Sequence, residues 1–260
     1  MLRLATALAA LMLIAAPAWA QQPAPAKPTV ILVHGAFAES AGWNGVISRL
    51  RAKGYPVIAA AVPLRSLKGD AAYVGALVSA EPGPVVLVGH SYGGEVISVA
   101  GAGHPNVKAL VFVDGLAPEV GESAASLGAR FPTATLAQAL APPVVLPDGS
   151  ADIYISPAKY HDQFAADVPT AEAALMAATQ RPIVKSALEE PAAALSWRSV
   201  PSWFVWGSRD LNIPPALHAF MAKRAHAREA VEVPGGSHVV MISHPDLVAA
   251  MIERAAQPGQ

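Results

Sequence analysis

The sequence predicts an α/β fold: a mostly parallel, six-stranded sheet flanked by helices, with an inserted helical cap. Short apolar runs rich in β-branched residues alternate with longer amphipathic segments, which is the pattern of parallel strands joined by helices. The apolar runs are continuous rather than alternating, as expected for strands covered on both faces. This rhythm stops between residues 117 and about 195, where alanine-rich helical stretches and proline-containing turns replace it.

Six apolar runs are the predicted strands. In chain order they cover residues 29–33, 57–61, 85–88, 109–113, 203–206 and 230–233. Helices are predicted between these strands. Ser40 and Ser66 stand where helix N-caps belong, and Ser243 with Pro245 indicates the start of the last helix.

The predicted core comprises residues 29–116 and 196–260, on either side of the interruption at 117–195. An insertion between two strands of an open sheet is expected to lie over the carboxyl ends of the strands, where such folds bind ligands. We therefore expect residues 117–195 to form a helical cap over a binding site.

The N-terminus has the features of an export signal. Arg3 precedes an apolar stretch over residues 4–16, and Ala18-Trp19-Ala20 offers small residues at the two positions that a signal peptidase reads. We predict a signal peptide over residues 1–20, a flexible leader over 21–28, and a mature chain in the periplasm or the medium. An uncleaved anchor is the alternative, although the apolar stretch is short for a bilayer. No stable membrane span is expected after cleavage.

The composition excludes several classes of protein. Of the 260 residues, 53% are hydrophobic and 14% are charged, and the net charge is −1, so the chain is neither disordered nor a nucleic-acid binder. It has no cysteine, which excludes disulfides, thiol catalysis and thiolate zinc sites. Apart from the histidine discussed below, the histidines show no metal-ligand spacing joined to a carboxylate cluster. Neither a metal nor an organic cofactor is expected.

The motif Gly89-His90-Ser91-Tyr92-Gly93 directly follows the apolar run 84–88 and runs into a helix-like segment. A G-x-S-x-G motif between a strand and a helix is typical of a nucleophile elbow, a turn so tight that the serine backbone is strained and its neighbours must be small. The turn exposes the serine oxygen at a helix N-terminus, whose dipole favours developing negative charge. Ser91 is the candidate nucleophile.

A serine hydroxyl needs a base, and the base needs a carboxylate to fix its tautomer. His238 lies in the glycine-rich loop after the last predicted strand, and Asp210 follows the strand before it. The order serine, aspartate, histidine is the one that strand–elbow–helix hydrolases use. Asp114, at the end of an earlier strand, is the main alternative acid; Glu232 lies within the last strand and is expected to point away.

Two backbone amides are predicted to form an oxyanion hole for the tetrahedral intermediate. One is the amide of Tyr92, which follows the nucleophile, and the other is the amide of Ala36, in the loop after the first strand. His34 is expected to brace this loop by hydrogen bonds rather than to take part in the chemistry.

These parts together resemble the α/β-hydrolase superfamily over residues 30 to about 255. The chain resembles bacterial esterases marked by HGAF, here His34 to Phe37, by GHSYGG, here Gly89 to Gly94, and by SHxVMxSHP, here Ser237 to Pro245. This branch is similar to the plant methylesterase and hydroxynitrile lyase group, which lacks the two leading strands of larger hydrolases. The resemblance would explain why the first strand directly follows the leader.

The resemblance also implies an activity. The lyase members have a threonine at the position of Gly35 and a lysine at that of Val239, and dehalogenase or epoxide hydrolase relatives have an aspartate at that of Ser91. These departures favour ester hydrolysis through an acyl-serine intermediate. A lactonase, a thioesterase or a cofactor-free perhydrolase with the same three residues is the alternative, as is a non-catalytic ligand-binding protein on this fold.

Aromatic residues of the cap and the first loop are candidates to line the substrate pocket. They are Phe37, Tyr154, Tyr160, Phe164 and Trp197. The cap has few charges, so the expected partner is a neutral, fairly apolar, small to medium ester.

Overall fold

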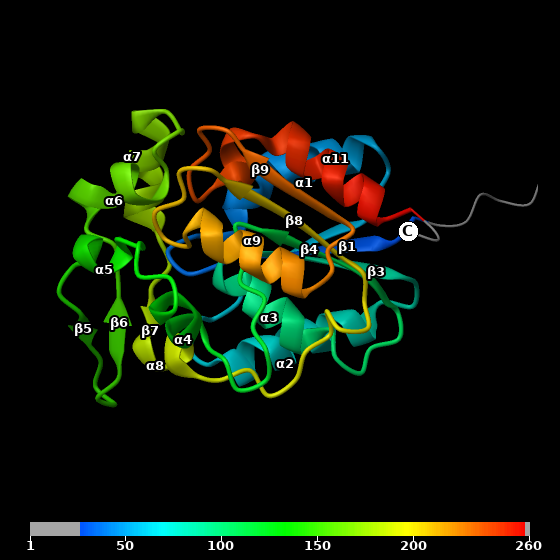
Figure 1. Ribbon diagram of the computed structural model, residues 1–260, viewed down its shortest axis with the longest axis horizontal. Helices are drawn as coiled ribbons and strands as arrows, with labels where there is room; N and C mark the ends of the chain where they lie inside the picture. Colours follow the sequence, from blue (N-terminus) through cyan, green and yellow to red (C-terminus); the bar gives the residue numbers. More distant parts are fainter. Residues whose placement is uncertain (1–26, 258–260) are drawn as a thin grey trace, which may run out of the picture.

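The computed structural model describes residues 27–257. The predicted signal peptide and most of the leader lie outside these residues. The predicted fold class is confirmed: six parallel strands form one sheet in the order β2-β1-β3-β4-β8-β9 (Figure 1). These strands are β1 (Thr29–Val33), β2 (Val57–Ala60), β3 (Val85–His90), β4 (Val107–Val113), β8 (Ser202–Gly207) and β9 (Glu229–Val233).

The two middle strands are the most completely buried part of the sheet. All six residues of β3 are buried, and in β4 only Lys108 is exposed. This burial on both faces explains the continuous apolar runs of the sequence, because residues 109–113 and all of β3 are shielded from water. Both strands are longer than predicted, since β3 continues to His90 and β4 begins at Val107. The extra length of β3 carries it to the edge of the site.

Helices cover both faces of the sheet. α1 (Asn44–Ala52) and α11 (Pro245–Ala255) lie on one face, and α2 (Leu67–Ala80), α3 (Tyr92–Ala100) and α9 (Pro215–Arg224) lie on the other (Figure 1). Two short helical turns, η1 (Ser40–Trp43) and α10 (Val240–Ser243), complete the core. No helix among residues 27–257 is long and apolar enough to cross a membrane.

The helix starts agree only in part with the predicted caps. Ser66 caps α2, because its side chain accepts a hydrogen bond from the amide of Gly69. Ser40 is the first residue of η1 rather than its cap, and its hydroxyl donates to the carbonyl of Ala60. Pro245 does begin the last helix, but Ser243 belongs to the preceding turn, α10.

The segment between β4 and β8 forms a separate layer at one end of the sheet (Figure 1). Its helices are α4 (Ala124–Ala129), α5 (Leu136–Ala139), α6 (Pro157–Phe164), α7 (Thr170–Thr179) and α8 (Lys185–Glu189). It also contains a small antiparallel sheet, which the sequence did not indicate: β5 (Val144–Val145), β6 (Ala151–Ile153) and β7 (Ile183–Val184). Strands of two or three residues are too short to produce a recognisable hydrophobic period.

Candidate active site

Ser91 lies in a strained turn between β3 and α3. Its backbone has φ 54° and ψ −125°, a conformation that non-glycine residues rarely adopt. Only glycine fits on either side: a Cβ on Gly89 would lie 2.4 Å from the carbonyl oxygen of Gly93, and a Cβ on Gly93 would lie 2.5 Å from that of Val33. The G-x-S-x-G motif therefore forms the elbow geometry that its spacing predicted.

The structure brings His238 to Ser91. The Nε2 atom of His238 lies 2.9 Å from Ser91 Oγ, and His238 comes from the loop between β9 and α10. This loop is held by a residue that the sequence reasoning did not select: His90 Nε2 lies 2.8 Å from the backbone oxygen of His238 and donates to it. Burial holds the pKa of His90 well below its ordinary value, so this ring is neutral and acts as a fixed donor.

Asp210 is the carboxylate that faces this imidazole. Its Oδ2 atom lies 2.7 Å from His238 Nδ1, while its Oδ1 atom accepts hydrogen bonds from the amides of Asn212 and Ile213, at 2.8 and 2.9 Å. Burial opposes the charge on Asp210, but the histidines and their hydrogen bonds outweigh it and lower the pKa of the carboxyl below its usual range. An ionised Asp210 requires the proton of neutral His238 to lie on Nδ1, which leaves Nε2 free to accept from Ser91.

Asp114, the alternative acid, does not bond His238. It ends β4 with φ 44°, and its two oxygens accept the backbone amides of Gly207 and Val240, at 2.8 and 3.0 Å. Complete burial, followed by the charge of Asp210, raises the pKa of Asp114 well above its usual value. The Asp114 side chain therefore connects the end of β8 to α10.

Glu232, the other alternative acid, accepts a hydrogen bond from Trp206 Nε1 on the neighbouring strand, at 3.0 Å.

The amides of Ala36 and Tyr92 are the predicted oxyanion donors, and both residues line the cavity at Ser91. The neighbouring amide of Phe37 is already occupied, because it donates to the backbone oxygen of Arg181 at 2.9 Å. Tyr92 is the first residue of α3, so its amide has no partner within the helix. His34 does bond its own loop, with Nδ1 2.9 Å from the oxygen of Gly35.

A cavity of about 310 Å³ opens at Ser91. Two of the five aromatic candidates, Phe37 and Phe164, line it together with Ser91 and His238. The other lining residues are mostly small or aliphatic, with Asn212 and Tyr92 as the exceptions: Ala36, Tyr92, Leu116, Ala124, Ala125, Gly128, Ala134, Leu136, Ala137, Leu140, Leu188, Asn212, Ile213 and Leu217.

The remaining three aromatic candidates do not line this cavity. The hydroxyl of Tyr160 donates to the backbone oxygen of Phe37 at 2.7 Å, and Trp197 Nε1 donates to that of Pro118 at 2.8 Å. Both rings therefore hold the cap to the core. Tyr154 follows β6, and its backbone oxygen accepts from Ala141 at 2.9 Å. The sequence does not distinguish aromatic residues that line the cavity from those that pack against the core, because both kinds are apolar and lie in the same segment.

The Phe37 backbone is consequently fixed from two sides by the segment between β4 and β8. Arg181 accepts its amide proton and Tyr160 donates to its oxygen. Phe37 has φ 60°, a left-handed conformation that non-glycine residues rarely adopt without support. These two hydrogen bonds provide the support and keep the preceding Ala36 amide in place.

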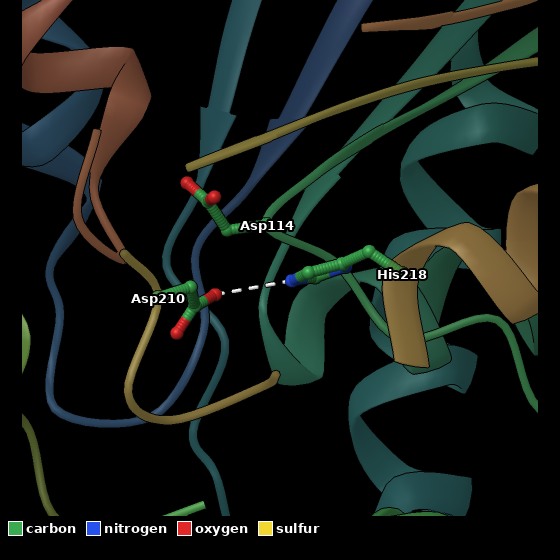
Figure 2. Close-up of side chains that lie close together, drawn as sticks. All are labelled: Asp114, Asp210 and His218. Carbon is green, nitrogen blue, oxygen red and sulfur yellow. Dashed lines mark hydrogen bonds and ion pairs between the residues drawn. The ribbon is translucent and has the colours of Figure 1, made fainter. Parts of the chain in front are cut away.

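One buried cluster near the site has side chains that could hold a metal ion. Ligand atoms of Asp114, Asp210 and His218 all lie within 4.8 Å of one another, and Figure 2 shows His218 reaching toward Asp210, with Asp114 beside them. All four lone-pair positions of Asp210 are taken by protein donors. A cation would have to displace these hydrogen bonds, so the donor set fits a hydrogen-bonded network rather than a metal site.

The protein has a buried parallel sheet and a serine on a strained strand-to-helix turn, with a histidine–aspartate pair beside it. This combination is typical of hydrolases. The chain belongs to the alpha/beta hydrolase family, whose model matches residues 30–251. The family resemblance drawn from the sequence motifs is confirmed.

Several known proteins are similar to this chain. The alpha/beta hydrolase nvfD of Aspergillus novofumigatus (strain IBT 16806) is 27% identical over 252 residues, covering 88% of this chain and 97% of that protein. A carbendazim hydrolyzing esterase of Nocardioides sp. (strain SG-4G) is 32% identical over 113 residues, covering 37% of this chain and 46% of that protein. The crystal structure of polyneuridine aldehyde esterase shares the fold at a TM-score of 0.77 and 17% identity, covering 89% of this chain and all of that chain. The family and its esterase relatives support a hydrolase.

Proposed function

We propose that the protein is a serine hydrolase that cleaves small to medium, fairly apolar carboxylic esters through an acyl-serine intermediate. One observation carries the proposal: the hydrogen-bonded series from Ser91 Oγ through His238 to Asp210, at 2.9 and 2.7 Å, opens onto an apolar cavity. Such a series activates a hydroxyl that would otherwise be a poor nucleophile at neutral pH. The esterase relative of Nocardioides agrees with this reaction class.

Acylation begins when Ser91 Oγ attacks the ester carbonyl carbon and its proton passes to His238 Nε2. Asp210 stabilises the imidazolium that forms. The amides of Ala36 and Tyr92 donate to the oxyanion, and each such donor contributes about 3 kcal/mol of transition-state stabilisation. The carbon–alkoxy bond then breaks, and His238 gives its proton to the departing alcohol.

Deacylation repeats these steps with water. His238 takes a proton from the water, whose oxygen attacks the acyl carbon, and then returns a proton to Ser91 Oγ as the acid leaves. Every proton transfer uses the same imidazole nitrogen. Apart from the ester and the water, the reacting groups belong to Ser91 and His238.

The substrate class follows from the cavity. Its lining is mostly alanine and aliphatic residues, with Ser91, His238 and Asn212 as the main polar side chains. A carboxylate or an ammonium placed there would lose its hydration without an ionic partner, at a cost of several kcal/mol. We therefore infer that the acyl or alcohol part lying in the cavity is uncharged.

The test is hydrolysis of p-nitrophenyl acetate and p-nitrophenyl butyrate by the purified protein and by Ser91→Ala. We expect steady release of p-nitrophenol by the wild type and a loss of about 10⁴-fold or more in kcat for the variant. A burst of p-nitrophenol followed by a slower rate would further support the acyl-enzyme. Equal, background-level rates for the two proteins would contradict the proposal and favour a ligand-binding protein.

A further inference from the structure

A second histidine bonds the carboxylate of Asp210. His218 lies on α9, and its Nε2 atom is 3.0 Å from Asp210 Oδ2, as Figure 2 shows. Its side chain is completely buried and lies parallel to the ring of Trp206, with 5.8 Å between the ring centroids and 18° between their planes. In this stacked and buried position the Nε2 atom of the imidazole faces the aspartate.

His218 supplies one of the four hydrogen bonds that the carboxylate of Asp210 accepts. Asp210 has two oxygens with two lone pairs each. The amides of Asn212 and Ile213 fill both positions of Oδ1, and the imidazoles of His238 and His218 fill both positions of Oδ2. The oxygen that faces His238 is therefore fixed by one other donor only, which is His218 Nε2–H.

Besides Asp210, the backbone oxygen of Gly115 is a second acceptor beside the imidazole of His218, and it is the weaker one because it carries no charge. The ionisable groups that face it are Asp210, Asp114 on β4 and His238. Burial lowers the pKa of His218, so the ring is neutral at pH 7 and its one proton is on Nε2, where the carboxylate requires a donor. A histidine with only a packing role would not need to donate a hydrogen bond to Asp210.

We propose that His218 is a positioning residue of the active site, which holds Asp210 Oδ2 against His238 Nδ1. This inference rests on the proposed function. The hydrogen bond from His218 fixes the rotation of the carboxylate about its side-chain torsion. It also withdraws part of the negative charge that would otherwise stabilise protonated His238. Removing it has two effects: the carboxylate becomes less well oriented, and its interaction with a protonated His238 becomes stronger.

The experiment compares His218→Leu, His218→Gln and His218→Asn with the wild type. The amide nitrogen of glutamine can reach the place of Nε2, whereas that of asparagine lies nearer the place of Nδ1. We expect His218→Leu and His218→Asn to lose about tenfold or more in kcat, with KM changed less than about twofold, and His218→Gln to keep most of the wild-type kcat. The acidic limb of the kcat/KM profile should move to higher pH in the leucine variant.

A matched control and a second measurement complete the test. Met221→Leu changes a buried residue one turn further along α9 and should leave kcat and the pH profile unchanged. Labelling of Ser91 by a fluorophosphonate, in which the serine oxygen displaces fluoride from phosphorus, measures nucleophile activation without any assumed ester. Its rate should fall in the same order as kcat. Circular dichroism and thermal unfolding identify variants that fail to fold, and the pair His218→Gln and His218→Asn then decides the question.

The outcomes separate the two proposals. If folded His218→Leu, or folded His218→Asn, matches the wild type in kcat, labelling rate and acidic limb, His218 has no positioning role. Equal losses in His218→Gln and His218→Asn would also contradict the inference, because the donor at the Nε2 position would then not matter. If the wild type neither hydrolyses the esters nor reacts with the fluorophosphonate faster than Ser91→Ala, the proposed function itself fails.

Discussion

Asp210 and Asp114 are both completely buried aspartates near the site, but their oxygens accept different donors. Asp210 accepts two imidazoles and two amides, whereas Asp114 accepts only the amides of Gly207 and Val240. An aspartate that bonds the imidazole orients it for proton transfer, and one that bonds backbone amides fixes the chain. Substitutions of Asp210 are therefore expected to reduce kcat, and substitutions of Asp114 to reduce the free energy of unfolding.

Asp210→Asn should reduce kcat by about 10³- to 10⁴-fold with little effect on folding, because an amide does not stabilise the imidazolium. Asp114→Asn should keep most of kcat and instead lower the free energy of unfolding by about 2 kcal/mol, since its NH₂ group faces a backbone N–H. The measurement is p-nitrophenyl butyrate hydrolysis beside urea unfolding. A greater loss of kcat in folded Asp114→Asn than in Asp210→Asn would reverse the assignment.

Asp70 gives a prediction for pH. It accepts the hydroxyl of Tyr92 at 2.9 Å and the amide of Leu64 at 3.1 Å, and burial raises the pKa of its carboxyl to about 6. The folded protein then binds a proton that the unfolded chain releases near pH 4. The free energy of unfolding should therefore decrease as the pH rises from about 4 to 6, by on the order of 2 kcal/mol from this residue.

Asp70→Asn removes this titration and can still accept from Leu64. Urea unfolding at pH 4.5 and pH 7.5 should show the variant gaining stability relative to the wild type as the pH rises. The opposite trend would mean that the ionised carboxylate is the stabilising form.

The sequence predicted three residues that the structure brings together, but not the histidines that bond them. Ser91, His238 and Asp210 follow strands in a fixed chain order, so the topology alone directs them to one end of the sheet. His90 and His218 bond that group from within a strand and a helix. A histidine in an apolar element has no sequence signal that distinguishes it from ordinary packing.

At the level of elements, the elbow between β3 and α3 depends on close backbone approach. Gly89→Ala would place a methyl group 2.4 Å from the oxygen of Gly93. We expect it to lower the free energy of unfolding by about 3 kcal/mol and to abolish activity. Gly83→Ala, where no atom lies within 4 Å of the added methyl, should change stability by less than about 0.5 kcal/mol. Similar thermal unfolding of the two variants would show that the turn can relax.

The loop after β1 has no room for a side chain at position 35. A Cβ on Gly35 would lie 2.5 Å from Ser91 Cβ and 2.7 Å from the oxygen of His90. The threonine found at this position in the lyase members therefore does not fit this backbone. Its absence here is a geometric property of the loop as well as a difference in sequence.

The strands were predicted well and the cap only in outline. The four inner strands are almost completely buried, the two edge strands β2 and β9 are only partly buried, and the composition identified all six within two residues at each end. The small sheet β5-β6-β7 has strands of two or three residues, held by tertiary contacts rather than by local preference. Ser40 failed as a cap because its hydroxyl bonds the neighbouring β2. Local signals do not reveal such long-range competition.

At the scale of the whole molecule, the cavity lies between the core and the cap. Ala124 on α4 lines it, whereas Ala129 at the other end of the same helix does not. Ala124→Phe should therefore reduce kcat/KM for p-nitrophenyl butyrate by about tenfold relative to p-nitrophenyl acetate, because the longer acyl chain competes for the same volume. Ala129→Phe is the control and should leave this ratio unchanged. An unchanged ratio in both variants would place the acyl chain elsewhere.

The N-terminal sequence predicts where the protein is found in the cell. We propose that the protein is exported and cleaved after Ala20. Expression of the full chain in a bacterium, followed by mass spectrometry of the extracellular and periplasmic fractions, should detect a mature protein that begins at Gln21. A full-length protein that stays with the membranes would instead favour an uncleaved anchor.

The double attachment of the Phe37 backbone limits how this protein can be modified by recombination. Tyr160 and Arg181 belong to the same segment that shapes the cavity, yet they also maintain the loop that carries the Ala36 amide. Exchanging that segment for one from a relative, in order to change substrate range, would remove the Tyr160 hydroxyl wherever the relative lacks a tyrosine, and would displace the backbone oxygen of residue 181 wherever its chain path differs. A functional chimera would have to retain the hydroxyl at position 160 and the backbone path that places the carbonyl of residue 181 beside Phe37, so specificity and transition-state binding are not independently replaceable here.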